Sequence, residues 1–276
     1  SLDIAGTLYN KEANGVWGQF FRPDSDGQPH ITGLAMLQIM RLAEQGNTIL
    51  INSTAPDGKV TDRVLTDFSN YFLNAHSGMS NYSPKQIKQF LENNVYFSTY
   101  KGCEISKLKI NEQGMVTQES VVEQLTTSEE ANALVSTINQ KREGLLVPKS
   151  LLKYGKTTTP CTYETENKMA HCVVLLCSDP TPENIAKIQQ EVRESGFDEI
   201  IAPEDECVFV GKQVGKETAV KLLAHHLGVE QENCVHIGDS KEDVMTEIDN
   251  VLIDSPKVVD KEKPKVKHVE EELFQL

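Results

Sequence analysis

Short apolar runs alternate with helical patterns at both ends of the chain, and this alternation restricts the fold more than any other feature. Residues 32–46 carry apolar side chains at helical spacing, and the run Thr-Ile-Leu-Ile-Asn at 48–52 follows them. The same alternation recurs from 171 to 252. A short continuous apolar run after a helix is typical of a strand that is buried on both faces of a parallel sheet. The pattern therefore predicts an α/β fold with a doubly wound parallel sheet.

Residues that start and end helices support the expected elements. Ser and Thr favour the cap position because their hydroxyls accept a hydrogen bond from the first turn, and proline fits that turn. Glycine favours the residue after a helix because it adopts a left-handed conformation without strain. The residues of these types are Thr32, Gly46, Ser83, Pro84, Thr181, Pro182, Gly196 and Gly228. We also expect a helix over 60–75, a hairpin around 112–114 and a short helix over 241–248.

The middle of the chain mixes short alternating runs with helical stretches and shows no internal repeat. A mixed segment between the two halves of a doubly wound sheet is typical of an inserted domain. We therefore expect a core domain made of residues 1–79 and 211–276. Residues 80–210 are expected to form an inserted α+β domain.

Composition narrows the class of protein. Of the 276 residues, 38% are hydrophobic and 25% are charged, so the chain can bury a core. The formal net charge of −14 disfavours a nucleic-acid binder, which needs clustered Lys and Arg. No apolar stretch approaches the length of a membrane span, so we expect no membrane partner.

The six cysteines do not indicate a metal site. None forms a C-x-x-C pair, and no histidine cluster accompanies them at zinc spacing. We interpret them as small buried side chains of a protein in a reducing compartment. The expected location is the cytoplasm, although a protein delivered elsewhere would have the same composition. The oligomeric state is left open.

Chemically active side chains follow the expected strands. Ser53 comes after the apolar run at 48–52, and Asp3 follows the short stretch Ser1-Leu2. Asp239 follows the run that ends in Gly238, with Asp243 four residues later. Lys216 begins the last long helix. In doubly wound sheets the ligand lies at the carboxyl ends of the strands, where these residues would meet. Carboxylates there can hold Mg²⁺, while the lysine and the hydroxyl bind phosphoryl oxygens.

The same residues resemble the four motifs of the haloacid dehalogenase superfamily, in the family's order. LDIAGTLY resembles the first motif, Asp-x-Asp-Gly-Thr-Leu, and ILINSTAP resembles the second, an apolar strand that ends in Ser or Thr. VGKETAVKLLAHHLG is similar to the third-motif region of the Cof-type branch, with Lys216 at the matching position and Lys212 as the fallback. VHIGDSKEDVM resembles the fourth motif, Gly-Asp-x-x-x-Asp. The long insertion before the third motif resembles a C2-type cap, which covers the site in that family.

The resemblance implies a Mg²⁺-dependent phosphatase that acts on a small phosphorylated metabolite such as a sugar phosphate. Asp3 would attack phosphorus and form an aspartyl-phosphate, while Ser53 and Lys216 would hold the phosphoryl group. Further implied substrate-binding residues are Gly6, Thr7 and Thr54. The implied metal ligands are Asp3, the backbone carbonyl of Ala5, Asp239 and Asp243.

Ala5 stands where the family has a second aspartate, which serves as general acid and base. Alanine can do neither, and such a group is typically worth about 10²–10⁴-fold in rate. One interpretation is a phosphatase that is impaired in this chain, by engineering or by natural loss. A second is a non-catalytic protein that binds a phosphorylated ligand or a protein partner. A third is a phosphonate-cleaving relative, since phosphonoacetaldehyde hydrolases carry Asp-x-Ala-Gly-Thr, although their cap directly follows the first motif.

Only Ser1 and Leu2 precede Asp3, whereas the family's first strand has several apolar residues before the nucleophile and lies at the centre of the sheet. A central strand of two residues would leave backbone groups of its neighbours unpaired. We therefore expect that the sequence begins inside a strand, with the amino group of Ser1 close to the core.

Overall fold

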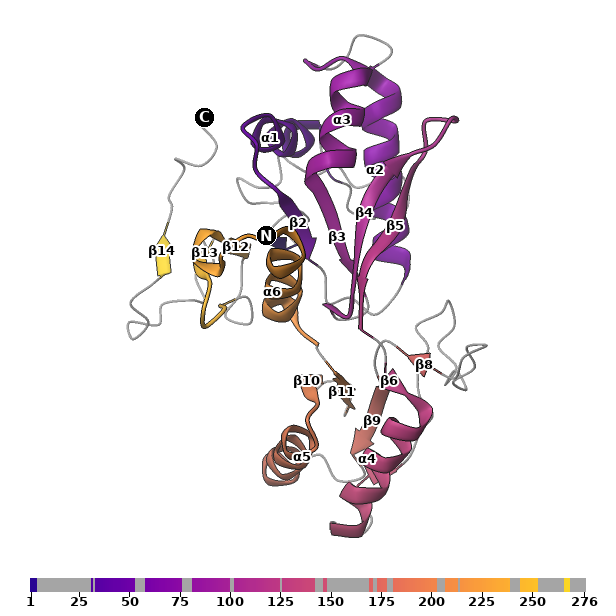
Figure 1. Ribbon diagram of the computed structural model, residues 1–276, viewed down its shortest axis with the longest axis vertical. Helices are drawn as coiled ribbons and strands as arrows, with labels where there is room; N and C mark the ends of the chain where they lie inside the picture. Colours follow the sequence, from indigo (N-terminus) through magenta and orange to yellow (C-terminus); the bar gives the residue numbers. More distant parts are fainter. Residues whose placement is uncertain are drawn as a thin grey trace.

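The structure is a computed structural model that describes residues 1–3, 31, 33–52, 58–75, 81–99, 102–124, 126–141, 146–147, 169–170, 173–177, 181–202, 207–212, 214–238, 244–252 and 266–268. These residues form a large unit on an eight-stranded sheet and a smaller unit on a four-stranded sheet (Figure 1). No helix among them combines the length and the apolar character that a membrane crossing requires.

The larger sheet is mostly parallel. Its strands are β1 (Leu2–Asp3), β2 (Ile49–Asn52), β3 (Val95–Thr99), β4 (Glu104–Ile110), β5 (Val116–Glu123), β12 (Val235–Gly238), β13 (Asp249–Leu252) and β14 (Val266–His268). Their order is β14-β13-β12-β1-β2-β3-β4-β5. The pairs from β14 to β3 are parallel, and β4 is antiparallel to both of its neighbours. The short strand β1 therefore lies inside the sheet, between β2 and β12.

Helices cover both faces of this sheet. The helices of the large unit are α1 (Gly33–Glu44), α2 (Gly58–Ala75), α3 (Pro84–Asn94) and α6 (Lys216–Leu227). Buried side chains of α1, α2 and α3 share a core with Ile49 and Ile51, while α6 packs against Leu50, Tyr96 and Ile105 on the opposite face. Successive side chains of a strand point to opposite faces, so β2 contributes to both cores. The expected doubly wound α/β fold is confirmed.

Most of the local predictions are confirmed as well. Ser83 accepts a hydrogen bond from the backbone N–H of Gln86 at 3.4 Å, and the Gln86 side chain accepts one from the N–H of Ser83 at 3.0 Å. This reciprocal pair is a capping box at the start of α3. The helix expected over 60–75 is α2, and the hairpin expected around 112–114 joins β4 and β5. Thr32 lies outside the described residues.

The smaller unit is made by the segment between β5 and α6. Its elements are β6 (Thr126–Thr127), α4 (Ser128–Lys141), β7 (Leu146–Val147), β8 (Met169–Ala170), β9 (Val173–Cys177), α5 (Pro182–Glu194), β10 (Asp198–Ala202) and β11 (Cys207–Gly211). The strands β10-β11-β9-β7 form one antiparallel sheet, and β6 pairs with β8. The chain enters this unit after β5 and returns from it after β11 (Figure 1).

Strand pairing bears on where the insertion begins. The sequence predicts an inserted domain over residues 80–210, but β3 pairs with β2, and β4 and β5 extend the larger sheet from β3. The division of the chain into domains stays a prediction. The pairing favours an insertion that starts after Glu123.

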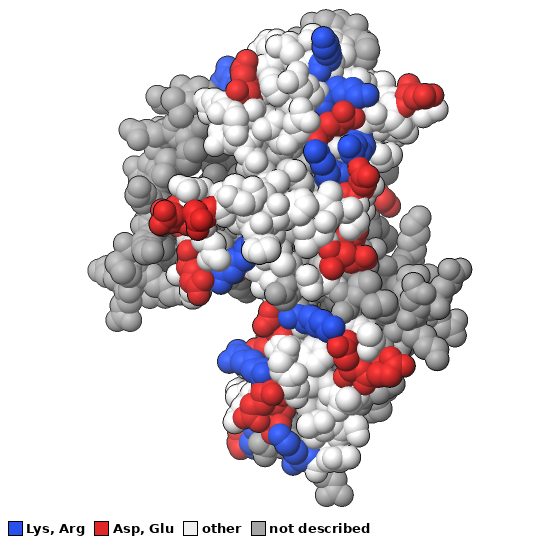
Figure 2. Space-filling view, viewed as in Figure 1, with Lys and Arg blue, Asp and Glu red and all other residues white. Residues whose placement is uncertain are grey.

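Acidic and basic side chains are mixed on the visible surface. On the face shown in Figure 2, the described Lys and Arg side chains lie next to Asp and Glu side chains on both units. Lys109 pairs with Glu119 at 3.4 Å, and Lys212 pairs with Glu130 at 2.8 Å. The described residues on this face therefore form no broad patch of one sign.

Candidate active site

Three neighbouring strands of the larger sheet end at one edge. Asp3 of β1 pairs with Asn52 of β2, and Leu2 pairs with Ile237 of β12. Because all three strands are parallel, their carboxyl ends lie side by side. Ser53 and Asp239 are the residues that directly follow β2 and β12. The sheet therefore places Asp3 between the strands that lead into the second and fourth motifs.

The helix α6 begins at the same edge. The side-chain Nδ2 of Asn52 donates a hydrogen bond to the backbone carbonyl of Lys216 at 2.8 Å. Asn52 is fully buried, and Lys216 is the first residue of α6. The structure thus brings Lys216 to the end of β2, next to the strand that carries Asp3. Of the predicted site residues, Asp3 and Lys216 lie in the described part of the chain, as does Lys212, the fallback for Lys216.

The backbone of Gly215, the residue before Lys216, packs closely against the backbone of Gly102. Gly215 is the N-cap of α6, with a φ of 118° and no side-chain capping bond. Gly102, in the connection between β3 and β4, has a φ of 92°, and a Cβ added to it would overlap the carbonyl oxygen of Gly215. The same Cβ would lie 3.1 Å from the carbonyl carbon of Gly215. The two backbones therefore approach more closely than any residue other than glycine at position 102 permits.

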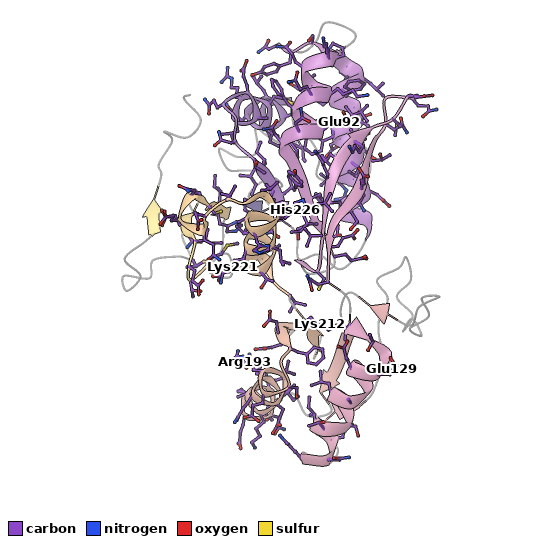
Figure 3. The ribbon with its side chains drawn as sticks, viewed as in Figure 1. Glu92, Glu129, Arg193, Lys212, Lys221 and His226 are labelled. Carbon is purple, nitrogen blue, oxygen red and sulfur yellow. The ribbon has the colours of Figure 1, made fainter. Side chains whose placement is uncertain are left out.

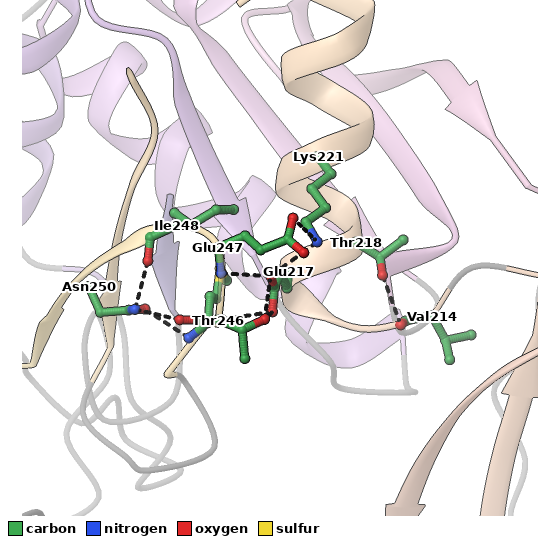
Figure 4. Close-up of polar contacts among 9 residues, drawn as sticks. Val214, Glu217, Thr218, Lys221, Thr246, Glu247, Ile248 and Asn250 are labelled. Carbon is green, nitrogen blue, oxygen red and sulfur yellow. Dashed lines mark hydrogen bonds and ion pairs between the residues drawn. The ribbon is translucent and has the colours of Figure 1, made fainter. Parts of the chain in front are cut away.

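The first turn of α6 also binds residues 246–247, which follow Asp243 in the sequence. Glu217 accepts hydrogen bonds from the backbone N–H groups of Thr246, at 3.1 Å, and Glu247, at 3.2 Å (Figure 4). The hydroxyl of Thr246 also donates to Glu217 at 3.0 Å. Lys221, one turn further along α6, lies 3.1 Å from Glu217 and 3.0 Å from Glu247. One carboxylate therefore links α6 to the loop that leads into β13.

The contacts within this cluster shift the pKa values of Glu217 and Lys221. Burial alone would raise the pKa of Glu217, but the hydrogen bonds from Thr246 and Lys221 outweigh it and hold the pKa below its usual value. Burial alone would lower the pKa of Lys221, but its contacts with Glu247 and Glu217 outweigh it and raise the pKa. Both side chains are therefore charged at neutral pH, which strengthens the hydrogen bonds between them.

Asn250 completes the support of this loop. Its Oδ1 accepts from the N–H of Met245 at 2.9 Å, and its Nδ2 donates to the carbonyls of Met245 at 2.8 Å and Ile248 at 2.7 Å. Asn250 is buried and lies at the start of β13. Together, Asn250 and Glu217 occupy the N–H groups of three successive residues, 245–247.

The prediction of a short helix over 241–248 is wrong for the part that the structure describes. Residues 244–248 are not helical. In a helix, the N–H groups of residues 245–247 would donate to carbonyls four residues earlier. Here the side chains of Glu217 and Asn250 accept from them instead, and these tertiary partners override the helical pattern.

The other predicted site residues lie outside the described part of the chain, so their roles stay predictions. These residues are Ala5, Gly6, Thr7, Ser53, Thr54, Asp239 and Asp243. Among the residues that are described, no group of three or more His, Cys, Asp or Glu side chains could hold a metal ion. Lys212, the fallback for Lys216, pairs with Glu130 of α4 at 2.8 Å, at the return from the smaller unit (Figure 3).

Two residues that organise this edge were not predicted from the sequence. Asn52 is a polar residue at the end of an apolar run, and this single break in the run was the available signal. Glu217 follows Lys216, where an acidic residue is expected simply because it favours the positive end of a helix. Its partners 29 and 30 residues away are not visible in the sequence.

Comparisons with known proteins agree with this topology. A family profile described as haloacid dehalogenase-like hydrolase matches residues 75–245. No curated protein matches the sequence significantly. Among solved structures, a sugar phosphatase of haloacid dehalogenase subclass IIB has a TM-score of 0.50 and 13% identity, with 91% of this chain and 85% of that chain covered. This likeness concerns the fold alone.

Two further solved structures are similar at lower scores. A haloacid dehalogenase-like hydrolase from Bacteroides thetaiotaomicron has a TM-score of 0.45 and 16% identity over 91% of this chain and 86% of that chain. The IMP-nucleotidase of Plasmodium falciparum has a TM-score of 0.43 and 15% identity over 78% of this chain. The match covers 52% of the nucleotidase, so this chain spans about half of its length. Because the family profile matches more than half of the sequence, the chain belongs to the haloacid dehalogenase-like hydrolases.

Proposed function

We propose that this chain is a phosphohydrolase-type protein that acts on a small phosphorylated metabolite. The observation that carries the proposal is the 2.8 Å bond from Asn52 to the carbonyl of Lys216, which ties a cationic residue to the strand beside Asp3. A lysine and a carboxylate at the carboxyl ends of parallel strands are suited to bind and attack a phosphoryl group. A sugar phosphatase shares the fold, so sugar phosphates are the first substrates to test.

We propose Mg²⁺ as the cofactor. Its ligands would be Asp3, the backbone carbonyl of Ala5, Asp239 and Asp243. The strand pairing supports this choice because β1 and β12 are parallel neighbours, and Asp239 directly follows β12. All four donors are oxygen atoms, which Mg²⁺ prefers. The bound ion would neutralise charge on the phosphoryl oxygens.

The protein's own groups would carry the two chemical steps. The carboxylate of Asp3 attacks phosphorus, the bond to the substrate's ester oxygen breaks, and an aspartyl-phosphate forms. Lys216 and Ser53 donate hydrogen bonds to the phosphoryl oxygens throughout. Water then releases phosphate and restores Asp3. Since Ala5 has no group that can give or take a proton, the leaving oxygen must take its proton from water, and both steps are slow.

We also propose that the smaller unit is the cap of this site. It is inserted between β5 and α6, so both of its connections lead back to the larger unit (Figure 1). We place its start after Glu123 instead of at residue 80, because β3, β4 and β5 belong to the larger sheet.

A second candidate function is favoured by Ala5. A protein that keeps the lysine and the nucleophile position but lacks the acid–base aspartate can bind a phosphorylated ligand without turning it over. Such a binding protein would show affinity for phosphate and Mg²⁺ in calorimetry. It would show no hydrolysis in the chain as it stands.

The decisive experiment compares the chain with its Ala5→Asp variant against a panel of sugar phosphates in the presence of Mg²⁺. We expect Ala5→Asp to raise turnover by about 10²–10⁴-fold, because it supplies the missing general acid and base. Asp3→Asn in the Ala5→Asp background is the control and should abolish the gain. Phosphate and Mg²⁺ binding without turnover in Ala5→Asp would favour the binding protein. Absence of both would contradict both candidates.

A further inference from the structure

Asn52 has a buried polar side chain, and within the described part of the chain only its amide nitrogen has hydrogen-bond partners. It is fully buried between the sheet and α6, and its Nδ2 donates to the carbonyl of Lys216 at 2.8 Å and to the hydroxyl of Ser1 at 3.3 Å. Its Oδ1 is buried and has no hydrogen-bond partner among the described residues. Ser98, its register partner on β3, is also fully buried, and its hydroxyl has no partner either.

This arrangement does not serve stability. A buried acceptor without a partner destabilises the folded state, and an apolar side chain of similar shape would avoid that penalty. The preceding residues of β2 are all apolar and buried. An apolar residue at position 52 would continue this pattern and extend the core beneath α6. It would not supply the 2.8 Å bond to the carbonyl of Lys216 or the longer 3.3 Å bond to the hydroxyl of Ser1.

We propose that Asn52 is a positioning residue that sets the distance between Lys216 and the nucleophile strand. It does not touch the substrate and acts through the backbone of Lys216. This inference rests on the proposed function, since Lys216 matters only if a phosphoryl group binds beside it.

The geometry makes Asn52 suited to this role. Its backbone pairs with Asp3, and its side chain holds Lys216, so a single residue spans the nucleophile position and the cation. The contact between Gly102 and Gly215 supports the helix start from the β3–β4 connection. The Asn52 bond joins the backbone of Lys216 directly to the end of β2. A displacement of about 1 Å in such a group can reduce turnover by about 100-fold.

The test is Asn52→Leu, made in the Ala5→Asp background so that turnover is measurable. Leucine keeps the number and branching of the side-chain heavy atoms of asparagine and removes both the donor and the unpartnered acceptor. We expect an unchanged or higher Tm, a fall in kcat of about 10–100-fold, and a loss of affinity for inorganic phosphate of about two- to tenfold. The matched control is Asn47→Leu. Asn47 also donates from Nδ2 to a backbone carbonyl, that of Leu42 at 3.0 Å, but it is exposed and precedes β2.

A double-mutant cycle with Lys216→Met separates positioning from general packing. If Asn52 acts through Lys216, the two substitutions are non-additive, and Asn52→Leu has little effect once Lys216 is methionine. Additive effects on phosphate affinity would overturn the proposal. A lowered Tm with unchanged kcat and phosphate affinity would also overturn it, because Asn52 would then be a structural residue. Should Asn52→Leu fail to fold, Asn52→Ala takes its place in the same cycle.

Amide hydrogen exchange keeps this inference distinct from the proposed function. If the Ala5→Asp chain neither binds phosphate nor turns over any substrate, the proposed function fails. Amide exchange in the first turn of α6, residues 217–220, still measures whether the Asn52 side chain holds the backbone of Lys216. If these amides exchange faster in Asn52→Leu than in Asn47→Leu, the Asn52 bond holds the start of α6. Equal exchange rates in the two variants overturn the positioning role of Asn52.

Discussion

Gly102 and Gly46 have nearly the same backbone conformation in different surroundings. Their φ angles are 92° and 85°, but a Cβ on Gly46 would have nothing within 4 Å, whereas one on Gly102 would overlap the carbonyl of Gly215. Gly46→Ala should therefore lower the free energy of unfolding by about 1–2 kcal/mol, through backbone strain alone. Gly102→Ala should cost about 2–5 kcal/mol, because overpacking adds to the strain. Urea unfolding of the two variants measures the difference, and equal losses would show that the Gly215 contact is unimportant.

Single residues also show where prediction from the sequence succeeded and where it stopped. The sequence indicated that Lys216 begins a helix, and this helix begins at the end of β2; the role of Lys216 in a site stays a prediction. Asn52 was not predicted as a site residue, because its importance comes from a carbonyl 164 residues further along the chain. Residue type and spacing along the sequence do not encode which backbone atom a side chain will reach.

At the scale of elements, the loop between β12 and β13 depends on the charge of Glu217. The pKa of this carboxyl lies below its ordinary value of 4.5, so its ionised form stabilises the fold. That contribution is complete above about pH 4.5 and is lost as the pH falls through the lower pKa of the folded state. Stability should therefore fall at acid pH partly because Glu217 releases Thr246 and Glu247.

Glu217→Gln tests this pH dependence. At neutral pH we expect a loss of about 1–2 kcal/mol in the free energy of unfolding, because hydrogen bonds to a charged acceptor are stronger than those to an amide. The difference from the unchanged chain should shrink as the pH falls below 4.5. Urea unfolding at several pH values measures it. Glu247→Gln is the control: Glu247 is mostly exposed and pairs with the same Lys221, so it should cost under about 1 kcal/mol at any pH.

A capping signal in the sequence marked a helix correctly at α3 but not over the described part of 241–248. The helix α3 has a capping box formed by Ser83 and Gln86, and both residues are visible in the sequence. The expected helix over 241–248 has a similar sequence signal, Ser240 with Asp243 three residues later. Its described part is held by Glu217 and Asn250, which belong to two other elements. Local rules failed where long-range partners took the backbone N–H groups.

At the scale of the whole molecule, one ion pair lies where the two units join. Glu130 accepts a hydrogen bond from the N–H of Thr127 at 2.8 Å and so caps α4, and it also pairs with Lys212 beyond β11 at 2.8 Å. The hydrogen bond from Lys212 is the main cause that lowers the pKa of Glu130. The same side chain therefore acts within the smaller unit and on the segment that returns from it.

Two substitutions separate these roles. Glu130→Gln keeps a capping acceptor but loses the ion pair, so it should cost under about 1 kcal/mol, and high salt should remove the difference from the unchanged chain. Glu130→Ala loses the cap as well and should cost about 1 kcal/mol more, independently of salt. Thermal unfolding at low and high salt measures both effects, with Glu129→Gln on the same helix as control. If the cost of Glu130→Gln were the same at both salt concentrations, the ion pair would not be its cause.

The sequence predicted that the larger sheet is a parallel sheet with helices on both faces. It did not predict that β4 and β5 belong to this sheet. The antiparallel strand β4 mixes buried and half-buried residues, while β5 is mostly exposed, and strands of either unit could show such burial. Alternation tells which face of a strand is buried. It does not tell which neighbour the strand pairs with, and for this reason the sequence did not indicate that β4 and β5 pair within the larger sheet.

The place of β1 between β2 and β12 has a consequence for the growing chain on the ribosome. About 180 residues, including the whole smaller unit, separate these two neighbours of β1 in the sequence. At a synthesis rate of about 5–20 residues per second, β12 emerges about 10–40 seconds after β2. During that time the nascent sheet has one unpaired inner edge, which other unfolded chains can join. The order of its strands thus predicts that the newborn protein exposes a strand edge until β12 has been made.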